Sequence, residues 1–449
     1  MRPVSTVCSI TLLALLLWTG AFGQVDAKHP SKQLPDTKSG TTASLAKLTA
    51  SDGQANNELG YSVSISGDTI VVGAPYATVS GHDAQGAVYV FERPASGWAD
   101  MTQTAKLTAS DGQVNAFFGS SVSISGDTVL VGADGANIGT KMSQGAAYVF
   151  VKPAKGWADM TQATKLLAPD GAAKSYFGSS VSVSGDTAVV AADGANVGSN
   201  YFAGAVYLFV RPAKGWETVL QPSAKLIASD ASKGDQLGYS VAIRGNTVVA
   251  GARSATVGAN SRQGAAYLYV KPADGWKDTH ETAKLIASDG AKDSQFGYAV
   301  CIDAGVVVVG APGRDFAGTA YEFLRPADGW ATTSAWKVKL MASDRVAGDQ
   351  LGYALAISGD TVLAGAPATI IPADVHQDAL YEFVRPATGP SGNISQSLRT
   401  SSGGRAQEGF GASVQLDGGT GVVGAPYATV GPNKYQGAGY VFKKLLGRP

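Results

Sequence analysis

The strongest constraint on the fold is a pattern that the chain repeats seven times between residues 59 and 426. Each copy has a Leu-Gly or Phe-Gly pair, an alternating segment, a Gly-Asp-type turn, a valine-rich segment and then Gly-Ala-Pro or a variant of it. We call the glycine of each opening pair the landmark glycine. The landmark glycines are Gly60, Gly119, Gly178, Gly238, Gly297, Gly352 and Gly411. Their spacings are 59, 59, 60, 59, 55 and 59 residues, and so regular a period indicates a repeat architecture.

The first copy has the pattern of four β-strands. Residues 61–66 alternate apolar and serine side chains, which is typical of a strand whose second face lies close to a neighbouring sheet. The Gly-Asp pair at 67–68 suits a two-residue reverse turn, and residues 69–72 return as a second strand. Residues 86–91 form a third strand, apolar on both faces, and residues 104–109 a fourth. Four antiparallel strands repeated radially predict an all-β fold, a seven-bladed β-propeller.

The two ends of the repeat region predict how the ring closes. The region begins with a lone fourth-type strand at residues 45–50 and ends after a third-type strand at residues 437–442. We expect these segments to pair, because the ring would then have no exposed sheet edge. A linear solenoid is disfavoured, since neither terminal copy has the polar character of a capping repeat. The predicted domain spans residues 44–443, followed by a tail at 444–449.

The landmarks also point to a known family. The Phe-Gly pair at 296–297 with Gly-Ala-Pro at 310–312 resembles the FG-GAP repeat family, which includes the seven-bladed propeller of integrin α-subunits and occurs in many exported bacterial proteins. The resemblance implies the propeller fold for residues 45–443. Integrin-type repeats often carry an Asp-x-Asp-x-Asp-Gly calcium loop, because calcium needs several converging oxygens. The corresponding interval here has a single acid, such as Asp68, so we expect no metal ion and no cofactor.

A second series of acids lies in the turns that join one blade to the next. These residues are Asp52, Asp111, Asp170, Asp230, Asp289 and Asp344. One interpretation is a weak cation site, with Glu58, Asp235 or Asp349 nearby in sequence. We favour Asx turns, in which the carboxylate accepts local backbone N–H groups.

The N-terminus predicts export. Residues 1–23 contain Arg2, an apolar run at 7–17 and a small-residue end, which is the pattern of a secretory signal peptide cleaved before Gln24. The run is short for a membrane anchor. Residues 24–43 are polar and turn-rich, as expected of a flexible leader. We therefore expect a secreted, periplasmic or cell-surface protein with no membrane span after cleavage.

Charge and cysteine content exclude other classes. Lys plus Arg and Asp plus Glu number 35 each, so no net field would attract nucleic acid. After signal cleavage Cys301 is the only cysteine, which rules out an internal disulfide. We interpret Cys301 as a small buried packing residue rather than a nucleophile. We expect a monomer.

No catalytic motif accompanies the repeats. The histidines are His29, His82, His280 and His376, and none recurs in register. The sequence has no His-x-x-x-His, Gly-x-Ser-x-Gly or phosphate-loop motif. We therefore predict that the protein is not an enzyme, although acid pairs assembled in space would be invisible in one sequence.

Variable loops are the best candidates for ligand contacts. In propellers, the loops between second and third strands and the turns between blades emerge on one face, which we call the loop face. The first set here is 76–85, 135–144, 194–203, 254–263, 313–317, 368–377 and 427–436. Because aromatic residues and arginine dominate binding hot spots, the candidate ligand-face residues are Tyr76, His82, Tyr201, Phe202, Arg262, Arg314, Tyr427 and Tyr435.

The leading hypothesis is an exported, non-catalytic propeller that binds a protein or surface polymer through its loop face, as an adhesion or interaction module. One alternative is a lectin-like propeller that binds carbohydrate. It predicts an aromatic residue recurring at equivalent loop positions, and only Tyr76 and Tyr427 recur. A second alternative is a propeller enzyme with its site in the central channel.

Overall fold

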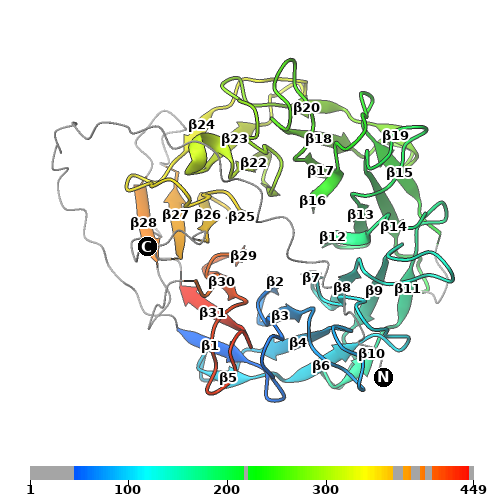
Figure 1. The fold of residues 1–449 in the computed structure, drawn as a ribbon, viewed down its shortest axis with the longest axis vertical. Helices are drawn as coiled ribbons and strands as arrows, with labels where there is room; N and C mark the ends of the chain where they lie inside the picture. The colour runs from blue at the N-terminus through cyan, green and yellow to red at the C-terminus, as the bar shows by residue number, and fades with distance from the viewer. Residues whose placement is uncertain (1–44, 217–220, 368–377, 386–394, 400–406, 444–449) are drawn as a thin grey trace, which may run out of the picture. The chain divides into compact units, whose positions relative to one another are not determined.

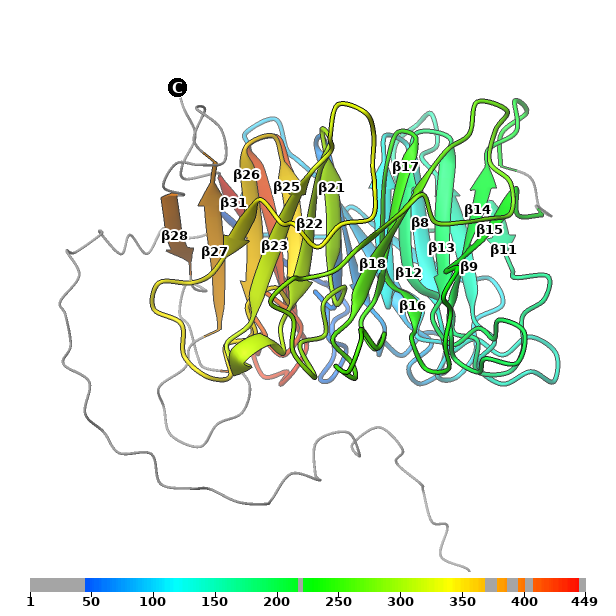
Figure 2. The same ribbon diagram turned by 90° about the horizontal axis from the view of Figure 1, so that it is seen from above.

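Seven small β-sheets stand around a central channel, with their strands running along the channel axis (Figure 1, Figure 2). The computed structural model describes residues 45–216, 221–367, 378–385, 395–399 and 407–443. Apart from one 3-10 turn, η1 (Arg314–Phe316), their regular structure consists of strands. The predicted seven-bladed all-β propeller is confirmed. The predicted signal peptide, leader, tail and loop 368–377, with His29 and His376, lie outside the described residues.

Each blade has four main strands, and in blades 1 to 6 these follow one another in sequence from the channel outward. Blade 1 has β2 (Ser62–Ser66), β3 (Thr69–Ala74), β4 (Ala87–Glu92) and β6 (Ala105–Thr108), and blade 2 has β7 (Ser121–Ser125), β8 (Thr128–Ala133), β9 (Ala146–Val151) and β11 (Thr164–Leu166). Blade 3 has β12 (Phe177–Ser184), β13 (Thr187–Ala192), β14 (Ala205–Val210) and β15 (Ala224–Ile227). Blade 4 has β16 (Leu237–Arg244), β17 (Thr247–Ala252), β18 (Ala265–Val270) and β20 (Ala283–Leu285). Blades 5 and 6 are β21 (Val300–Asp303), β22 (Val306–Ala311), β23 (Thr319–Leu324) and β24 (Val338–Leu340); and β25 (Ala354–Ser358), β26 (Thr361–Ala366), β27 (Ala379–Val384) and β28 (Ser395–Arg399).

The two ends of the described chain close the ring, as the sequence predicts. Blade 7 takes its three inner strands from the C-terminal end, and these are β29 (Ser413–Asp417), β30 (Thr420–Ala425) and β31 (Ala438–Lys443). Its outer strand is β1 (Ala46–Thr49), which pairs antiparallel with β31 and places Lys47 opposite Tyr440. Blue β1 and red β31 lie side by side in Figure 1. Pairing the first strand with the last leaves no open blade at this seam.

Three short strands add parallel pairing between neighbouring blades. They are β5 (Met101–Thr102) on β1, β10 (Met160–Thr161) on β6 and β19 (Thr279–His280) on β15. Each comes from the connection between the third and fourth strands of one blade and pairs with the outer strand of the blade before it. The sequence pattern of four strands did not predict them.

The landmark glycines are required by close contacts between backbones. Gly178 has a φ of +95°, and a Cβ atom there would lie 2.4 Å from the carbonyl oxygen of Ala146. Gly132 of the preceding blade lies against the same backbone, and a Cβ atom there would lie 2.0 Å from the carbonyl oxygen of Gly178. Ser121 donates a hydrogen bond of 2.8 Å to that oxygen. Glycine recurs at all seven landmark positions because two blades approach each other here without room for a side chain.

The serines of the innermost strands satisfy backbone groups of the next blade. Ser123 Oγ accepts a hydrogen bond of 3.0 Å from the N–H of Val183, one blade further along. At two other seams an aspartate takes this role, since Asp303 accepts from the N–H of Gly359 and Asp417 from that of Gly67. Each inner strand is the free edge of its sheet, so these side chains provide acceptors that the sheet itself lacks.

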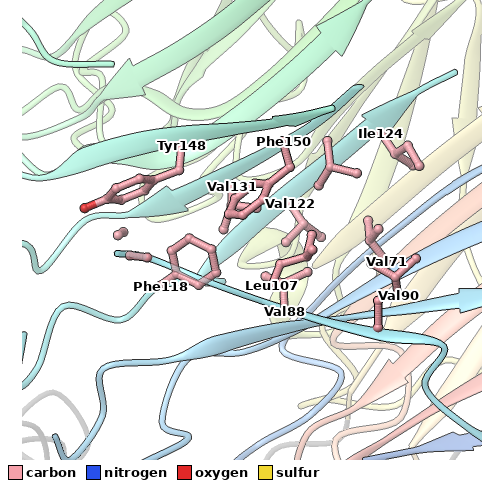
Figure 3. Close-up of a cluster of buried hydrophobic side chains, with 14 of the residues drawn as sticks. Val71, Val88, Val90, Leu107, Phe118, Val122, Ile124, Val131, Tyr148 and Phe150 are labelled. Carbon is pink, nitrogen blue, oxygen red and sulfur yellow. The ribbon is translucent and has the colours of Figure 1, made fainter. Parts of the chain in front are cut away.

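The hydrophobic core lies between blades rather than within one. Figure 3 shows the cluster between the first two blades, whose labelled side chains are Val71, Val88, Val90 and Leu107 from blade 1 with Phe118, Val122, Ile124, Val131, Tyr148 and Phe150 from blade 2 or the turn before it. Phe118, beside its landmark glycine, packs edge to face with Tyr148 and Phe150 at centroid distances of 5.5 and 5.9 Å. The bulky residue of each landmark pair is therefore a core residue of the seam.

The acids of the inter-blade turns also join blades, which corrects their interpretation as simple Asx turns. Asp111 follows blade 1 but accepts hydrogen bonds from Tyr148 at 3.0 Å and Lys165 at 2.5 Å, both in blade 2. We call such an Asp, Tyr and Lys set a latch. Complete latches are Asp52, Tyr89 and Lys106; Asp111, Tyr148 and Lys165; Asp170, Tyr207 and Lys225; Asp230, Tyr267 and Lys284; and Asp289, Tyr321 and Lys339. Burial raises the pKa of Asp111, but the bonds from Lys165 and Tyr148 outweigh burial and hold that pKa below its ordinary value.

Candidate functional site at the mouth of the central channel

The variable loops and the inter-blade turns do share one face. The N–H of Glu58, in the turn before blade 1, donates to the carbonyl oxygen of Tyr435 in a blade 7 loop at 3.1 Å. The N–H of Phe117 donates in the same way to Ala84. Because these bonds tie each loop to the next inter-blade turn, loop residues and turn residues surround the channel mouth together.

Three of the predicted ligand-face residues come together beside this mouth. The rings of Tyr427 and Tyr435 meet edge to face at 6.0 Å. Tyr76 contacts Tyr61 at 6.3 Å and Phe117 at 5.4 Å. Tyr61, Tyr427 and Tyr435 are 41%, 43% and 49% exposed, which is high for residues of this size. These four tyrosines, which we call the aromatic rim, span the seam where blades 7 and 1 meet.

The other five predicted residues stay on their own loops. Tyr201 and Phe202 are exposed on the blade 3 loop, and neither lines the channel. His82 lies 3.1 Å from the Oε1 atom of Gln85 through its Nδ1 atom. Arg262 forms an ion pair with Asp293, and Arg314 lies 4.0 Å from Asp289. Both arginines therefore have acidic partners within the chain.

A cavity of about 520 Å³ occupies the loop-face mouth of the channel. Its wall includes the residue after each landmark glycine, and these residues are Tyr61, Ser120, Ser179, Tyr239, Tyr298, Tyr353 and Ala412. Tyr298 contacts Tyr239 at 4.9 Å and Tyr353 at 4.8 Å. These residues are not among the predicted ligand-face residues, because they lie inside the repeat rather than in the variable loops. Their fixed place after the landmark glycine was the available signal.

Two carboxyl groups complete the wall. Asp134 and Asp193 follow the second strands of blades 2 and 3, where the first copy has the proline of Gly-Ala-Pro. Asp193 is only 8% exposed. Burial and the nearby Asp134 raise the pKa of Asp193 to about 6, against the opposing effect of Arg253, and burial also raises the pKa of Asp134. The departures Gly-Ala-Asp and Ala-Ala-Asp in these copies could have identified both residues from sequence.

Arg253 brings a positive charge to the same region. It takes the proline position in blade 4, and its guanidinium carbon lies 3.7 Å from the ring centroid of Tyr239 and 5.6 Å from that of Tyr298. Its Nε atom donates to Gln236 at 3.2 Å. Stacking of this kind is a cation–π interaction. The positive charge of Arg253 also offsets part of the negative charge of the nearby carboxyl groups.

Glu58 lies in the turn beside the aromatic rim. Burial raises its pKa to about 7. Within the described residues, no three His, Cys, Asp or Glu side chains come together as a metal site. The chemistry available at the mouth is thus that of hydroxyls, carboxyl groups with raised pKa and aromatic faces.

The opposite end of the channel holds a smaller cavity of about 310 Å³. Its charged lining residues are Arg244, Asp303 and Asp417, and Arg244 forms an ion pair with Asp303 at 3.2 Å. Cys301 also faces this end and is buried, as predicted, and burial raises the pKa of its thiol. Asp303 and Asp417 here accept hydrogen bonds from the backbone of neighbouring blades.

The fold and the landmarks define the class of this protein as an FG-GAP propeller. The model of the FG-GAP repeat matches residues 43–91, 101–150, 160–209, 221–269, 279–323 and 336–379. The chain belongs to this family. Each of the first five matches covers the outer strand of one blade and the three inner strands of the next blade, except the last residue of the third strand.

No curated protein matches the sequence. Among solved structures, the chain is similar to the periplasmic gluconolactonase PpgL of Pseudomonas aeruginosa, with 15% identity and a TM-score of 0.46 over 76% of this chain and 85% of that one. In the part of the chain that the structure describes, no helix has the length and apolar character needed to cross a membrane.

The prediction that the chain is not an enzyme is corrected. One of the solved structures to which the chain is similar is that of an enzyme, a gluconolactonase. The ground for the prediction was weak, because the mouth of a propeller is assembled from residues far apart in sequence. Asp134 and Asp193, which are 59 residues apart, are an example of such a pair.

Proposed function

We propose that this protein binds a protein or surface polymer on its loop face, centred on the aromatic rim and the channel mouth. The aromatic rim is the observation that carries the proposal. Tyr61, Tyr427 and Tyr435 are large, exposed and close to a cavity, and aromatic side chains supply much of the contact area at binding sites. Exposed apolar groups gathered in one place favour an interaction surface over scattered decoration.

The proposal includes export. The apolar run at 7–17 with its small-residue end supports a signal peptide, and FG-GAP repeats and a periplasmic solved neighbour are compatible with it. A partner outside the cytoplasm, such as a surface protein or polymer, would then be the natural ligand.

The test compares two sets of aromatic substitutions in the full chain. Tyr61→Ala with Tyr427→Ala and Tyr435→Ala removes the exposed part of the rim, while Tyr201→Ala with Phe202→Ala removes exposed rings from the blade 3 loop. Binding to immobilised cell-surface extract of the native host is measured by biolayer interferometry, with thermal melting as a check of folding. We expect the rim variant to bind at least tenfold more weakly and the control to bind like wild type. Equal binding by all three proteins would refute the proposal.

A further inference from the structure

Blades 2 and 3 depart from the rest of the channel mouth in the same two positions. Both have serine after the landmark glycine, Ser120 and Ser179, where blades 1, 4, 5 and 6 have tyrosine. Both have aspartate after the second strand, Asp134 and Asp193, where proline or Arg253 stands in the other copies. We call these four residues the polar sector. The rest of the wall, with Tyr239, Tyr298, Tyr353 and Tyr61, is the aromatic sector.

The polar sector contains buried groups that lack hydrogen bonds. The Oδ1 atom of Asp134 and the hydroxyls of Ser120 and Ser179 are buried and make none. Ser120 lies beside Asp134 and Ser179 beside Asp193, close enough for each serine to oppose the rise in the pKa of its carboxyl group. Buried polar atoms nearly always have partners, and each one left without a partner costs about 1–3 kcal/mol. Groups of this kind in a cavity wall favour a ligand that supplies several donors and acceptors.

The charges at the channel mouth further restrict the chemical class of the ligand. Arg253 already stacks on the aromatic sector and lowers the pKa of Asp193 against the effect of burial. A cation in the ligand would therefore meet a positive charge beside the carboxyl groups that it needs. Neutral hydroxyl groups avoid this repulsion, since each can donate to a carboxylate and accept from a serine.

The size and the opposed sectors fit such a ligand as well. The cavity of about 520 Å³ lies within the range of small-molecule sites, which is roughly 300–1,000 Å³. Tyrosine rings offer flat apolar faces on one side, and hydrogen-bonding groups stand on the blades of the other. A ring that carries hydroxyls at its edge and C–H groups on its face uses both sectors together.

We propose that the channel mouth binds a neutral sugar residue of a glycan, with its hydroxyls on the polar sector and its C–H face on the aromatic sector. This inference rests on the proposed function and names the chemistry of the surface polymer. It requires one central sugar site rather than an equivalent site on every blade. The absence of a recurring loop aromatic, which argues against several equal sites, therefore does not count against it.

The experiment uses the full chain on an array of neutral, amine-bearing and acidic glycans, followed by titration calorimetry with the best neutral glycan. The double variant Asp134→Asn with Asp193→Asn alters the acceptors. A second variant, Ser179→Tyr, restores the tyrosine of other blades and fills part of the polar sector. Asp68→Asn with Asp186→Asn is the matched control, because these carboxylates lie in exposed turns at the other end of the blades.

Selective binding of a neutral glycan, weakened at least tenfold in both site variants and unchanged in the control, is the expected result. The inference is overturned if no neutral glycan binds, if binding survives both substitutions in folded protein, or if amine-bearing glycans bind best. An empty array together with loss of extract binding in the rim variant would overturn this inference while the proposed function stands. Failure of both experiments would remove the binding function itself.

Discussion

Blades 1 to 4 and blades 5 to 7 are built from one repeat, but they keep its rules to different degrees. The first four combine the 59- or 60-residue spacing with complete latches and an apolar residue after the latch tyrosine, whereas blade 5 keeps its latch but not that apolar residue. In blades 5 and 6 that apolar residue becomes Glu322 and Glu382, both fully buried. In sequence, Leu398 takes the place of the latch lysine in the sixth copy, and Gly403 takes the place of the latch aspartate before the seventh.

This comparison separates the residues that every blade requires from the residues that can vary between blades. Every blade keeps its landmark glycine, since backbone atoms of neighbouring blades meet there and no side chain fits. Latches and inner-strand serines vary, because an exposed ion pair or a single hydrogen bond contributes only about 1 kcal/mol. Positions fixed by excluded volume should therefore respond alike in both regions, whereas positions fixed by polar contacts should not.

Landmark substitutions should have the largest effect and should erase the difference between the regions. A Cβ atom at Gly178 would lie 2.4 Å from the Ala146 oxygen and one at Gly352 would lie 2.7 Å from the Thr319 oxygen, both at positive φ. We expect Gly178→Ala and Gly352→Ala each to lower the free energy of unfolding by about 3 kcal/mol or more, by overpacking and backbone strain. Chemical denaturation measures the loss. Gly185→Ala, with φ of +57° and no neighbour within 4 Å, is the control and should cost about 1 kcal/mol.

The next effect should be confined to the irregular region. Arg385 lies 3.1 Å from the buried Glu322, and removing it as Arg385→Met leaves that carboxyl without its counter-charge. We expect a loss of about 2–3 kcal/mol at pH 8, and recovery in the double variant Glu322→Val with Arg385→Met, which restores the apolar residue of blades 1 to 4. A double variant that stays as unstable as Arg385→Met would contradict this prediction, because it would show that the Glu322 side chain itself stabilises the packing between blades.

The pH dependence of Arg385→Met follows from the same pair. Burial raises the pKa of Glu322, and Arg385 opposes that rise. A carboxyl whose pKa is higher in the folded than in the unfolded state favours folding at low pH, and its contribution falls as pH rises through the folded-state pKa. Without Arg385 the rise is unopposed. Denaturation midpoints should therefore decrease more steeply between pH 5 and pH 8 in the variant than in wild type, and parallel curves would contradict this.

A smaller loss is expected where a serine serves the next blade. Ser123→Ala removes the acceptor of the Val183 N–H, and we expect a cost of about 1 kcal/mol. Asp303→Ala should cost more, since Asp303 accepts from Gly359 and also pairs with Arg244. Thermal melting of the two variants tests this order. An equal loss would show that the ion pair between Asp303 and Arg244 contributes nothing to stability.

The smallest effect should be a gain. The register places residue 398 opposite Tyr381, as Lys165 stands opposite Tyr148, and Tyr381 already donates to Asp344 at 3.0 Å. Leu398→Lys should complete the sixth latch and stabilise the fold by about 0.5 kcal/mol at low salt. The gain should vanish in 1 M salt because screening weakens exposed ion pairs. Stabilisation that persists in high salt would mean that the lysine acts by some other contact.

Much of the scaffold could be predicted because each copy confirms the others. Seven landmark glycines gave the blade number, and the lone strand at 45–50 gave the closure with β31. The latches could not be predicted, since Asp111 is near Ser110 and Gly112 in sequence while its partners Tyr148 and Lys165 belong to the next blade. Of the site, Tyr76, Tyr427 and Tyr435 were found on loops, but the tyrosines after the landmark glycines were not.

The sequence by itself determined the ring: the period, the alternation and the glycines specify seven blades, because these features act through neighbouring residues and repeat without change. Only the tertiary structure decided what the ring encloses. Asp134 and Asp193 are 59 residues apart in the chain, yet closure of the ring brings both to the wall of one cavity, together with Tyr298 and Tyr353 from the other half. Burial and mutual repulsion, which shift the pKa of Asp193, arise only in that assembled wall.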